Sequence, residues 1–346
     1  MVEGKPISIG NVAYVLGMSV KKLHRWYQNV LSGFSQAVER GEIGKDDLLV
    51  REEGEVEKIR VPILEEDNLG QQMAIDEKTI DGTGYTILSN RQTNKIALMA
   101  STFKVKHLIK LMDRFDIEKR MQVVSLSRDM ASNYDWFGRQ AFMNAYQVVD
   151  KFHVIKHAVE QLQAVRIRYR QQELAMRREA AKNKQRYTEE VLSNGDTTLQ
   201  LLARSRGLLF SSPDKWTEHQ KQRAKVLFEK YPEIKEAYLL LQRLRQWLRP
   251  PKGKTTYRVT RDKKLQQIKT LLKDFKCSGI DEMKNVALMI NRNTAQIINY
   301  FIAKETNAKA EALNQNLQRF INVNYGARNS DFFLYRVKIH FAITSK

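Results

Sequence analysis

Two neighbouring strand patterns that each end on an aspartate constrain this sequence more than any other feature. The segment "QVVSLSRD" ends at Asp129 and "YQVVD" ends at Asp150, and residues with helical spacing follow both. An aspartate at such a position can cap the N-terminus of the following helix. It can instead present a carboxylate for chemistry, if distant parts of the chain bring further carboxylates to the same place.

Three more strand patterns precede this pair. The segments "QQMAIDEKTI", "GYTILSN" and "KIALMAS" have the composition of strands, and "SNRQTN" has the composition of a turn between the last two. "VKHLIKLMDRF" then has apolar residues at helical spacing, and the text after Phe152 is almost wholly helical. Hairpin-linked strands followed by alternating helix and strand predict an α/β fold with a mixed sheet flanked by helices.

The chain is strongly basic, with 59 Lys and Arg against 39 Asp and Glu and a net charge of +20 over 346 residues. Cations that neutralise phosphates release condensed counterions, so this balance favours a polyanionic partner. We expect double-stranded DNA rather than a membrane, because the sequence has neither a bilayer-length apolar run nor a signal peptide. The single cysteine, Cys277, excludes an intramolecular disulfide and a Cys-rich zinc site, and it suits a cytoplasmic location.

The N-terminal segment 11–32 has the pattern of a helix-turn-helix. Gly17 lies at the expected turn, and Ser19 is the expected N-cap of the second helix. That helix would present Lys21, Lys22 and Arg25 to DNA.

Two later stretches of the helical region, 166–186 and 237–261, are also rich in cations. The second contains no acidic residue, and Pro-Pro-Lys-Gly at 250–253 predicts an exposed loop within it. A long stretch of one charge sign with aromatic residues favours DNA contact over an ordinary solvated face. The candidate DNA contacts are Arg166, Arg170, Arg177, Arg178, Arg243, Arg245, Arg249, Lys252, Lys254 and Arg258.

Two carboxylates can meet in a sheet of this order, because Asp76 lies in the first strand and Asp129 ends the fourth. Close carboxylates repel unless a cation lies between them, and Mg²⁺ prefers such oxygen ligands. A pair of ions in this setting can carry out phosphoryl transfer. Glu311, in a long helix predicted over 294–323, is the candidate third acid, with Asn307 one turn earlier on the same face.

Three motifs resemble those of DDE transposases from bacterial insertion sequences of the ISL-three kind, over about residues 70–341. They are "SRDMASNY", "NAYQVVDKFHVIK" and "TNAKAEALNQNLQ…YGARNSDFFLYRVK". The resemblance implies an RNase H-like catalytic domain whose Asp76, Asp129 and Glu311 are catalytic and hold Mg²⁺, in two ions for which Mn²⁺ can substitute. It makes Asp150 and His153 supporting residues beside the site. It also implies a homodimer or higher oligomer on DNA.

The expected organisation follows from the resemblance and the charge pattern. We expect a helix-turn-helix region in 1–36, a linker with at most one short strand in 37–69, and the first part of the catalytic core in 70–160. A basic helical insertion is expected in 161–292, because the interval between Asp129 and Glu311 is very long. Residues 293–346 would be C-terminal helices that complete the core.

The function implied is that of a DNA transposase, which cuts transposon ends and joins their 3′-hydroxyls to target DNA. The alternatives are an RNase H-like nuclease or resolvase without strand transfer, and a non-catalytic DNA-binding protein derived from a transposase. One departure bears on DNA recognition, since such transposases often begin with a Cys-rich zinc module and this chain has none. Either the helix-turn-helix and the insertion recognise the ends alone, or a separate small DNA-binding protein supplies the missing module.

Overall fold

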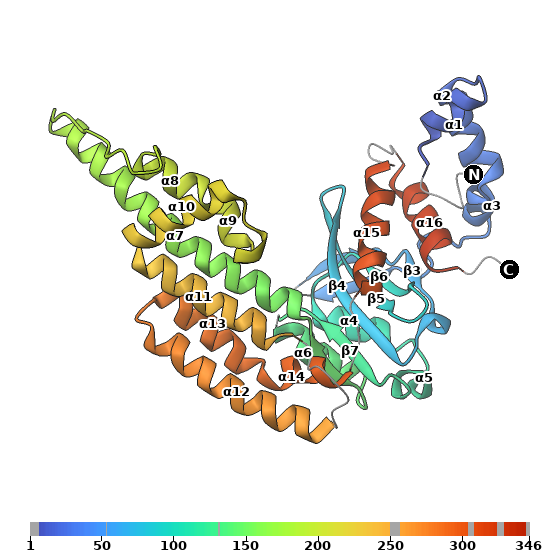
Figure 1. Cartoon of the computed structure of the whole chain (residues 1–346). Helices are drawn as coiled ribbons and strands as arrows, with labels where there is room; N and C mark the ends of the chain where they lie inside the picture. The colour runs from blue at the N-terminus through green and yellow to red at the C-terminus, as the bar shows by residue number, and fades with distance from the viewer. Residues whose placement is uncertain are drawn as a thin grey trace. The chain divides into compact units, whose positions relative to one another are not determined.

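The computed structural model describes the backbone of residues 7–52, 54–130, 132–249, 257–303, 308–323 and 329–343. It excludes the side chains of residues 52, 132, 257–260, 302–303, 308–311 and 314. The chain divides into two compact units, Met1–Val148 with Glu305–Lys346 and Val149–Lys304 (Figure 1). The first is an α/β unit and the second is helical.

A six-stranded mixed sheet forms the centre of the α/β unit, with the order β3-β6-β5-β4-β7-β8. Its strands are β3 (Ile63–Leu64), β4 (Gln72–Ile80), β5 (Thr83–Asn90), β6 (Lys95–Ala100), β7 (Ser125–Arg128) and β8 (Tyr146–Val149). The strands β3, β6, β5 and β4 pair antiparallel in that order, whereas β4 pairs parallel with β7. The predicted mixed sheet with flanking helices is therefore confirmed.

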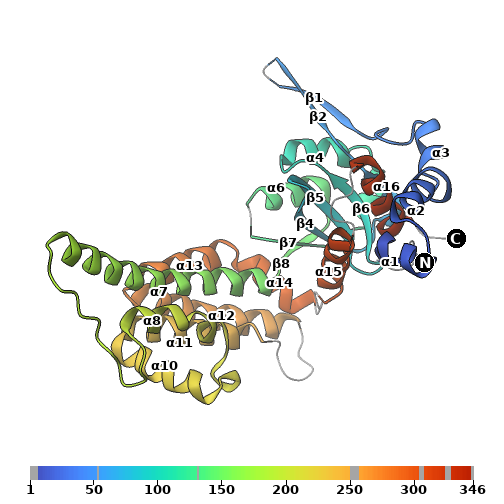
Figure 2. The same cartoon turned by 90° about the horizontal axis from the view of Figure 1, so that it is seen from above.

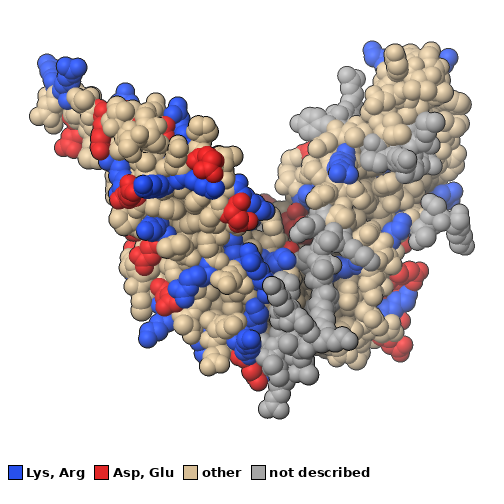
Figure 3. Space-filling view, viewed as in Figure 1, with Lys and Arg blue, Asp and Glu red and all other residues tan. Residues whose placement is uncertain are grey.

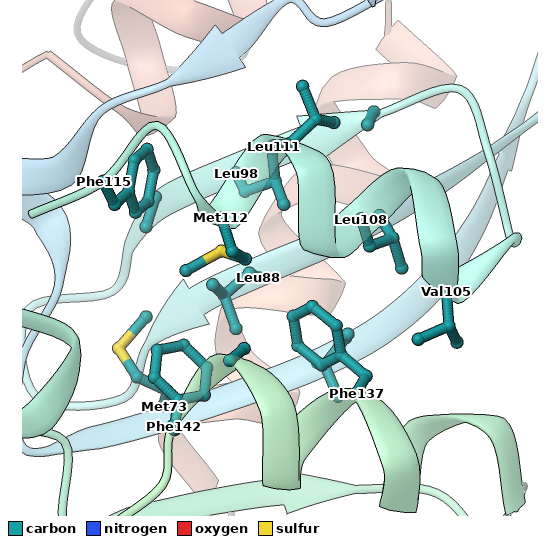
Figure 4. Close-up of a cluster of buried hydrophobic side chains, with 14 of the residues drawn as sticks. Met73, Leu88, Leu98, Val105, Leu108, Leu111, Met112, Phe115, Phe137 and Phe142 are labelled. Atoms are coloured by element: carbon teal, nitrogen blue, oxygen red, sulfur yellow. The ribbon is translucent and has the colours of Figure 1, made fainter. Parts of the chain in front are cut away.

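Helices cover both faces of this sheet. On one face, α4 (Val105–Met112) and α6 (Ser132–Ala141) pack on Met73, Leu88 and Leu98 (Figure 4). On the other, α15 (Ala308–Val323) and α16 (Ser330–Phe341) pack on Ile87 and Met99. Both faces are buried because successive strand residues alternate between them, and the central strands β5 and β6 supply apolar side chains to both clusters. A short helix, α5 (Ile117–Met121), precedes β7.

The segment expected to be a linker, 37–69, contains more strand than predicted. Strands β1 (Leu48–Glu52) and β2 (Glu55–Ile59) form a separate antiparallel ribbon, which extends from the α/β unit in Figure 2. Val50 and Ile59 anchor its base in the core beneath α4. The prediction of at most one short strand was wrong. The glutamates at the exposed tip interrupt the apolar pattern, so the two strands are hard to recognise from the sequence. The segment also contains β3 and a 3₁₀ turn, η2 (Glu66–Asn68).

The N-terminal segment forms α1 (Ile9–Val15), α2 (Val20–Trp26), a π-helical turn η1 (Tyr27–Leu31) and α3 (Phe34–Glu39). Gly17 has a φ of +61° between α1 and α2, a left-handed conformation that glycine adopts without steric cost. Ser19 precedes α2 as predicted, but among the described atoms its side chain makes no cap hydrogen bond. Phe332 of α16 packs against Tyr27 and Phe34, and this contact anchors the segment.

The second unit contains helices α7 (Lys151–Lys182), α8 (Thr198–Arg204), α9 (Arg206–Phe210), α10 (Glu218–Lys230), α11 (Pro232–Trp247), α12 (Tyr257–Cys277), α13 (Asp281–Arg292) and α14 (Thr294–Ala303), with a 3₁₀ turn η3 (Pro213–Lys215). Both α11 and α13 pack along α7. The unit extends beyond the expected 161–292 at both ends. Within the segment predicted as one helix over 294–323, the structure describes α14 and α15, and residues 304–307 lie outside the described residues. Helix α14 belongs to this helical unit rather than to the α/β unit.

Candidate active site

Asp76 lies on β4, on the sheet face that α15 and α16 cover. It pairs in register with Ile87 of β5, whose side chain is buried in the cluster formed with these two helices. The Asp76 side chain is half-buried, and its Oδ1 accepts a hydrogen bond of 2.8 Å from the backbone N–H of Glu77. The carboxylate is thus held by its own strand at the edge of the apolar layer.

Asp129 is the first residue after β7, the strand that runs parallel to β4. The register aligns Ala74 with Ser127, so Asp76 and Asp129 each follow two residues later on adjacent strands. Neighbouring strands lie about 4.8 Å apart. The parallel pairing therefore brings the two aspartates to the same level of the sheet, as predicted.

Glu311 lies in the first turn of α15, and its side chain is outside the described residues. Asn307 also lies outside them. Further along the same helix, Leu313, Leu317 and Phe320 are buried against the sheet face that carries Asp76. The helix that bears the predicted third acid therefore packs on the sheet face that carries Asp76.

A buried arginine supports the backbone of Asp129. The Arg128 side chain is 1% exposed, and it donates to Gln147 Oε1 at 2.6 Å, to Asp135 Oδ1 at 2.8 Å and to the Asp129 carbonyl at 2.8 Å. Burial lowers the pKa of Arg128, against the opposing effect of Asp135. Burial would raise the pKa of Asp135, but Arg128 and Arg139 outweigh it and lower that pKa. The pair is therefore ionic at neutral pH.

A tyrosine of α6 holds the residue after Asp76. Glu77 points to the sheet face opposite Asp76, as strand alternation predicts, and its Oε1 accepts a 2.6 Å hydrogen bond from the Tyr134 hydroxyl. Burial, followed by the bond to Glu77, raises the pKa of Tyr134, so this hydroxyl remains a donor. Sequence reasoning missed both Tyr134 and Arg128. A charged residue inside an apolar strand pattern, which must find a buried partner, was the available signal for Arg128.

Asp150 caps a helix. It immediately precedes α7, and its side chain accepts a 2.9 Å hydrogen bond from the N–H of Phe152. His153 is half-buried, with its ring edge-on to Phe152 at 5.8 Å between centroids. This local geometry is that of a first helical turn.

The donor chemistry of the two strand aspartates fits a hard divalent cation, because both supply carboxylate oxygens from half-buried positions. Among the described side chains, no three His, Cys, Asp or Glu residues are grouped so as to hold a metal ion. Glu311 is outside that set. The side chains of Asp76 and Asp129 are thus described, whereas for Glu311 only the backbone position in α15 is described.

The candidate DNA contacts differ in their exposure. Exposed cations are Lys21, Lys22, Arg25, Arg177, Arg178, Arg243 and Arg249, whereas Arg170 is half-buried. Arg177 and Arg243 form ion pairs with Glu189 and Asp274. Figure 3 shows Lys and Arg side chains over the surface of the helical unit, including the far end of α7. The side chains of Lys252, Lys254 and Arg258 lie outside the described residues.

Two of these candidates are internal to the helical unit. Arg166 is 6% exposed and donates to the Leu202 carbonyl, so the expectation that it contacts DNA was wrong. Arg245 is half-buried and donates to the Phe210 carbonyl at 2.7 Å. Both guanidinium groups donate to backbone carbonyls within the unit, and we remove the buried Arg166 from the DNA-contact set, whereas Arg245 stays a prediction.

The family model DDE_Tnp_ISL3, described as "Transposase", matches residues 73–337, which is well over half of the chain. The chain belongs to this transposase family. The match spans β4 to α16, including Asp76, Asp129, Glu311 and the whole helical unit, and it leaves out α1 to α3. No curated protein and no solved structure matches the chain.

Membership of the transposase family makes the chain a DNA-binding enzyme that cuts and joins DNA. The family also accounts for the strongly basic composition, since the partner is a polyanion. Across the described part of the chain, none of the helices has the length and apolarity needed to span a bilayer.

Proposed function

We propose that this transposase cuts the ends of an insertion sequence and joins their 3′-hydroxyls to target DNA, using divalent ions held by Asp76, Asp129 and Glu311. One observation carries the proposal. Asp76 on β4 and Asp129 directly after the parallel strand β7 lie at the same level, and Asp76 is on the face covered by the helix that contains Glu311. Such carboxylates have a physical reason to be together when they share cations.

The sheet supports an RNase H-like assignment of the core. Three antiparallel strands (β6, β5 and β4) are followed in space by β7, parallel to β4, and then by β8. Helices α4 and α6 cover one face and α15 the other. A carboxylate on the first strand of the meander and one after the next parallel strand fit the catalytic positions of such a core.

The proposed chemistry is an in-line displacement at phosphorus, used once for cutting and once for joining. When bound, a pair of Mg²⁺ or Mn²⁺ ions would activate the attacking oxygen and stabilise the leaving oxygen. Asp76 and Asp129 would hold them through carboxylate oxygens at half-buried positions, where screening by water is reduced. The chain itself needs to supply no nucleophile, because water attacks in the first step and a DNA 3′-hydroxyl in the second.

DNA would be held by cations on both units. The exposed Lys21, Lys22 and Arg25 of α2 fit end recognition by a helix-turn-helix, and the Gly17 turn between α1 and α2 supports that assignment. Exposed Arg178 and Arg249 of the helical unit would contact phosphates. We further propose that two or more copies act on paired ends, with a separate small DNA-binding protein as an optional partner.

The proposal is tested by incubating the full chain with Mg²⁺ or Mn²⁺ and a DNA that carries the element's own ends. Cleavage and joined products are measured for wild type, Asp129→Asn and Asp150→Asn. We expect Asp129→Asn to lose both products by a factor of at least about 10³, because an asparagine cannot balance the cation charge. Asp150→Asn should retain most activity, because asparagine is also a good helix cap.

Other outcomes point to the alternatives. Cleavage without joined products would indicate a nuclease or resolvase. End binding without cleavage, repeated after addition of the neighbouring small protein, would contradict the catalytic assignment. Equal loss from Asp129→Asn and Asp150→Asn would make Asp150 a ligand rather than a cap.

A further inference from the structure

Helix α6 is joined by hydrogen bonds to the strands that carry both aspartates. It begins three positions after Asp129, and its adjacent residues Tyr134 and Asp135 contact different strands. The Tyr134 hydroxyl donates to Glu77 Oε1 at 2.6 Å, and the Glu77 N–H donates to Asp76 Oδ1 at 2.8 Å. Through Glu77, α6 is thus linked to the carboxylate of Asp76.

The second link reaches Asp129. Asp135 Oδ1 accepts a 2.8 Å hydrogen bond from Arg128 Nη2, while Arg128 Nη1 donates to the Asp129 carbonyl at 2.8 Å. The guanidinium is planar, so its donors have a fixed relative geometry. Asp135 therefore fixes Arg128, and Arg128 fixes the backbone of Asp129.

The direction of the tyrosine bond is defined by its neighbours. Thr86 Oγ1 lies 3.4 Å from the Tyr134 hydroxyl, but Thr86 donates its own proton to the Thr102 carbonyl at 2.6 Å. The single Tyr134 proton goes to Glu77, the closer and charged acceptor. Tyr134 is 1% exposed, so its ring cannot turn away without disturbing the core.

Helix α6 packs tightly against the sheet. Phe137 is fully buried in the core beneath α4 (Figure 4). The Asp135 carbonyl accepts a 2.8 Å hydrogen bond from Gln147 Nε2. A Cβ at Gly138 would lie 2.6 Å from Gln147 Nε2 and 2.9 Å from Leu126 Cδ2, so the glycine permits the close approach of α6 to the sheet. A rigid helix is the support that a positioning role requires.

We propose that α6 sets the separation and direction of the Asp76 and Asp129 carboxylates, and that Tyr134 and Asp135 are positioning residues that govern divalent-cation affinity. The inference rests on the proposed function, since it takes these aspartates as metal ligands. Groups that orient metal ligands from behind typically change metal affinity by 10- to 100-fold when they are removed. Neither Tyr134 nor Asp135 needs to touch DNA or metal to act in this way.

The test measures Mn²⁺ binding to the full chain by electron paramagnetic resonance, without DNA. We expect Tyr134→Phe and Asp135→Ala, which each remove one of these hydrogen bonds, to weaken binding by about 10-fold. The Mg²⁺ concentration for half-maximal cleavage should rise by a similar factor, with a much smaller change at saturating metal. Glu77→Gln keeps an acceptor oxygen for Tyr134 and should bind nearly as well as wild type.

Two matched controls remove equivalent groups elsewhere. Tyr335→Phe deletes a hydroxyl that donates to the Ser32 carbonyl at 3.1 Å, far along the chain from the aspartates. Arg139→Gln removes the exposed partner of Asp135 and leaves the Arg128 bond in place. Neither variant should change Mn²⁺ affinity.

The outcomes separate the inference from the proposed function. If wild type binds Mn²⁺ with no dependence on Asp76 and Asp129, the metal site itself is wrong. If that dependence holds but Tyr134→Phe and Asp135→Ala bind as tightly as wild type, only the positioning role is overturned. Should Tyr134→Phe fail to fold, Glu77→Ala removes the same bond from an exposed side chain and must weaken binding instead.

Discussion

The ends of β7 and β8 look alike in sequence and differ in structure. Each is a short buried strand followed by an aspartate and then a helix. Asp150 is directly adjacent to α7 and caps it, whereas α6 begins three positions after Asp129. Asp150 therefore has the position of a helix cap, whereas Asp129, which we propose as a metal ligand, does not directly precede a helix. The distance between an aspartate and the next helix can be read from a sequence once helix starts are known.

The surroundings of the two ends differ as well. Asp129 follows a buried arginine whose donors are taken by Gln147, Asp135 and the Asp129 carbonyl. Asp150 is followed by Lys151, whose ammonium lies over the Tyr300 ring at 5.3 Å from its centroid. The first end has a buried ionic network, whereas the second has a helix-cap hydrogen bond and a cation–ring contact. The more extensive side-chain network therefore lies beside Asp129, the aspartate that we propose as a metal ligand.

The largest predicted difference in stability comes from replacing the cation next to each aspartate, which is Arg128 beside Asp129 and Lys151 beside Asp150. Arg128→Met leaves Asp135 and Gln147 without their partner in a buried setting and should reduce the free energy of unfolding by about 3 kcal/mol. Lys151→Met removes only a cation–ring contact and should cost about 0.5 kcal/mol. Urea titrations of both variants, followed by circular dichroism, measure the two values. Equal losses would mean that the network at Asp129 has no special stability.

The pH dependence of stability provides a control for the Arg128→Met measurement. The pKa of Asp135 is lowered in the folded state, so its contribution to stability is present above the ordinary aspartate pKa of about 4 and is lost as pH falls through the folded value. Arg128→Met removes the main cause of that lowering. The stability gap between wild type and Arg128→Met should therefore narrow below about pH 4. A gap that stays constant with pH would attribute the loss to packing alone.

The next prediction concerns the packing of α6, the helix that follows Asp129, against the sheet. Gly138→Ala places a Cβ against Gln147 and Leu126 and should destabilise the chain by about 1–3 kcal/mol, because the tightly packed helix must shift. Gly207→Ala in α9 is the matched control, since no described atom lies within 4 Å of a Cβ there. It should stabilise by about 0.5 kcal/mol. A neutral Gly138→Ala would show that α6 can move without cost.

The sequence was sufficient to predict strands β4 to β8 and most of the helices, and Asp76 and Asp129 stay predicted metal ligands. Short apolar runs such as those in 84–90 and 95–101 are local signals of strands, and β4 pairs parallel with β7 in the sheet. The β1–β2 ribbon was missed because its apolar anchors, Val50 and Ile59, are separated by a charged tip.

Side-chain partnerships were harder to predict than positions. The density of cations made both Arg166 and Arg178 candidate DNA contacts. In the structure, Arg166 is buried and donates to the Leu202 carbonyl, whereas Arg178 is exposed. Composition cannot distinguish them, because which helix face is buried depends on α8 and α9 packing on α7. Tyr134 and Glu77 are likewise 57 positions apart in sequence, and only the folded sheet brings them together.

The smallest predicted effect distinguishes the cap from the ligand at Asp150 itself. Asp150→Ala removes the acceptor for the Phe152 N–H and should lower stability by about 1 kcal/mol, while Asp150→Asn should lower it by only a few tenths, at most about 0.3 kcal/mol. Mn²⁺ affinity should be unchanged in both, measured as for the α6 variants. A metal ligand predicts the opposite, because asparagine would lose the charge and weaken metal binding almost as much as alanine. The two substitutions therefore separate a hydrogen-bonding role from a charge role at the strand end that most resembles Asp129.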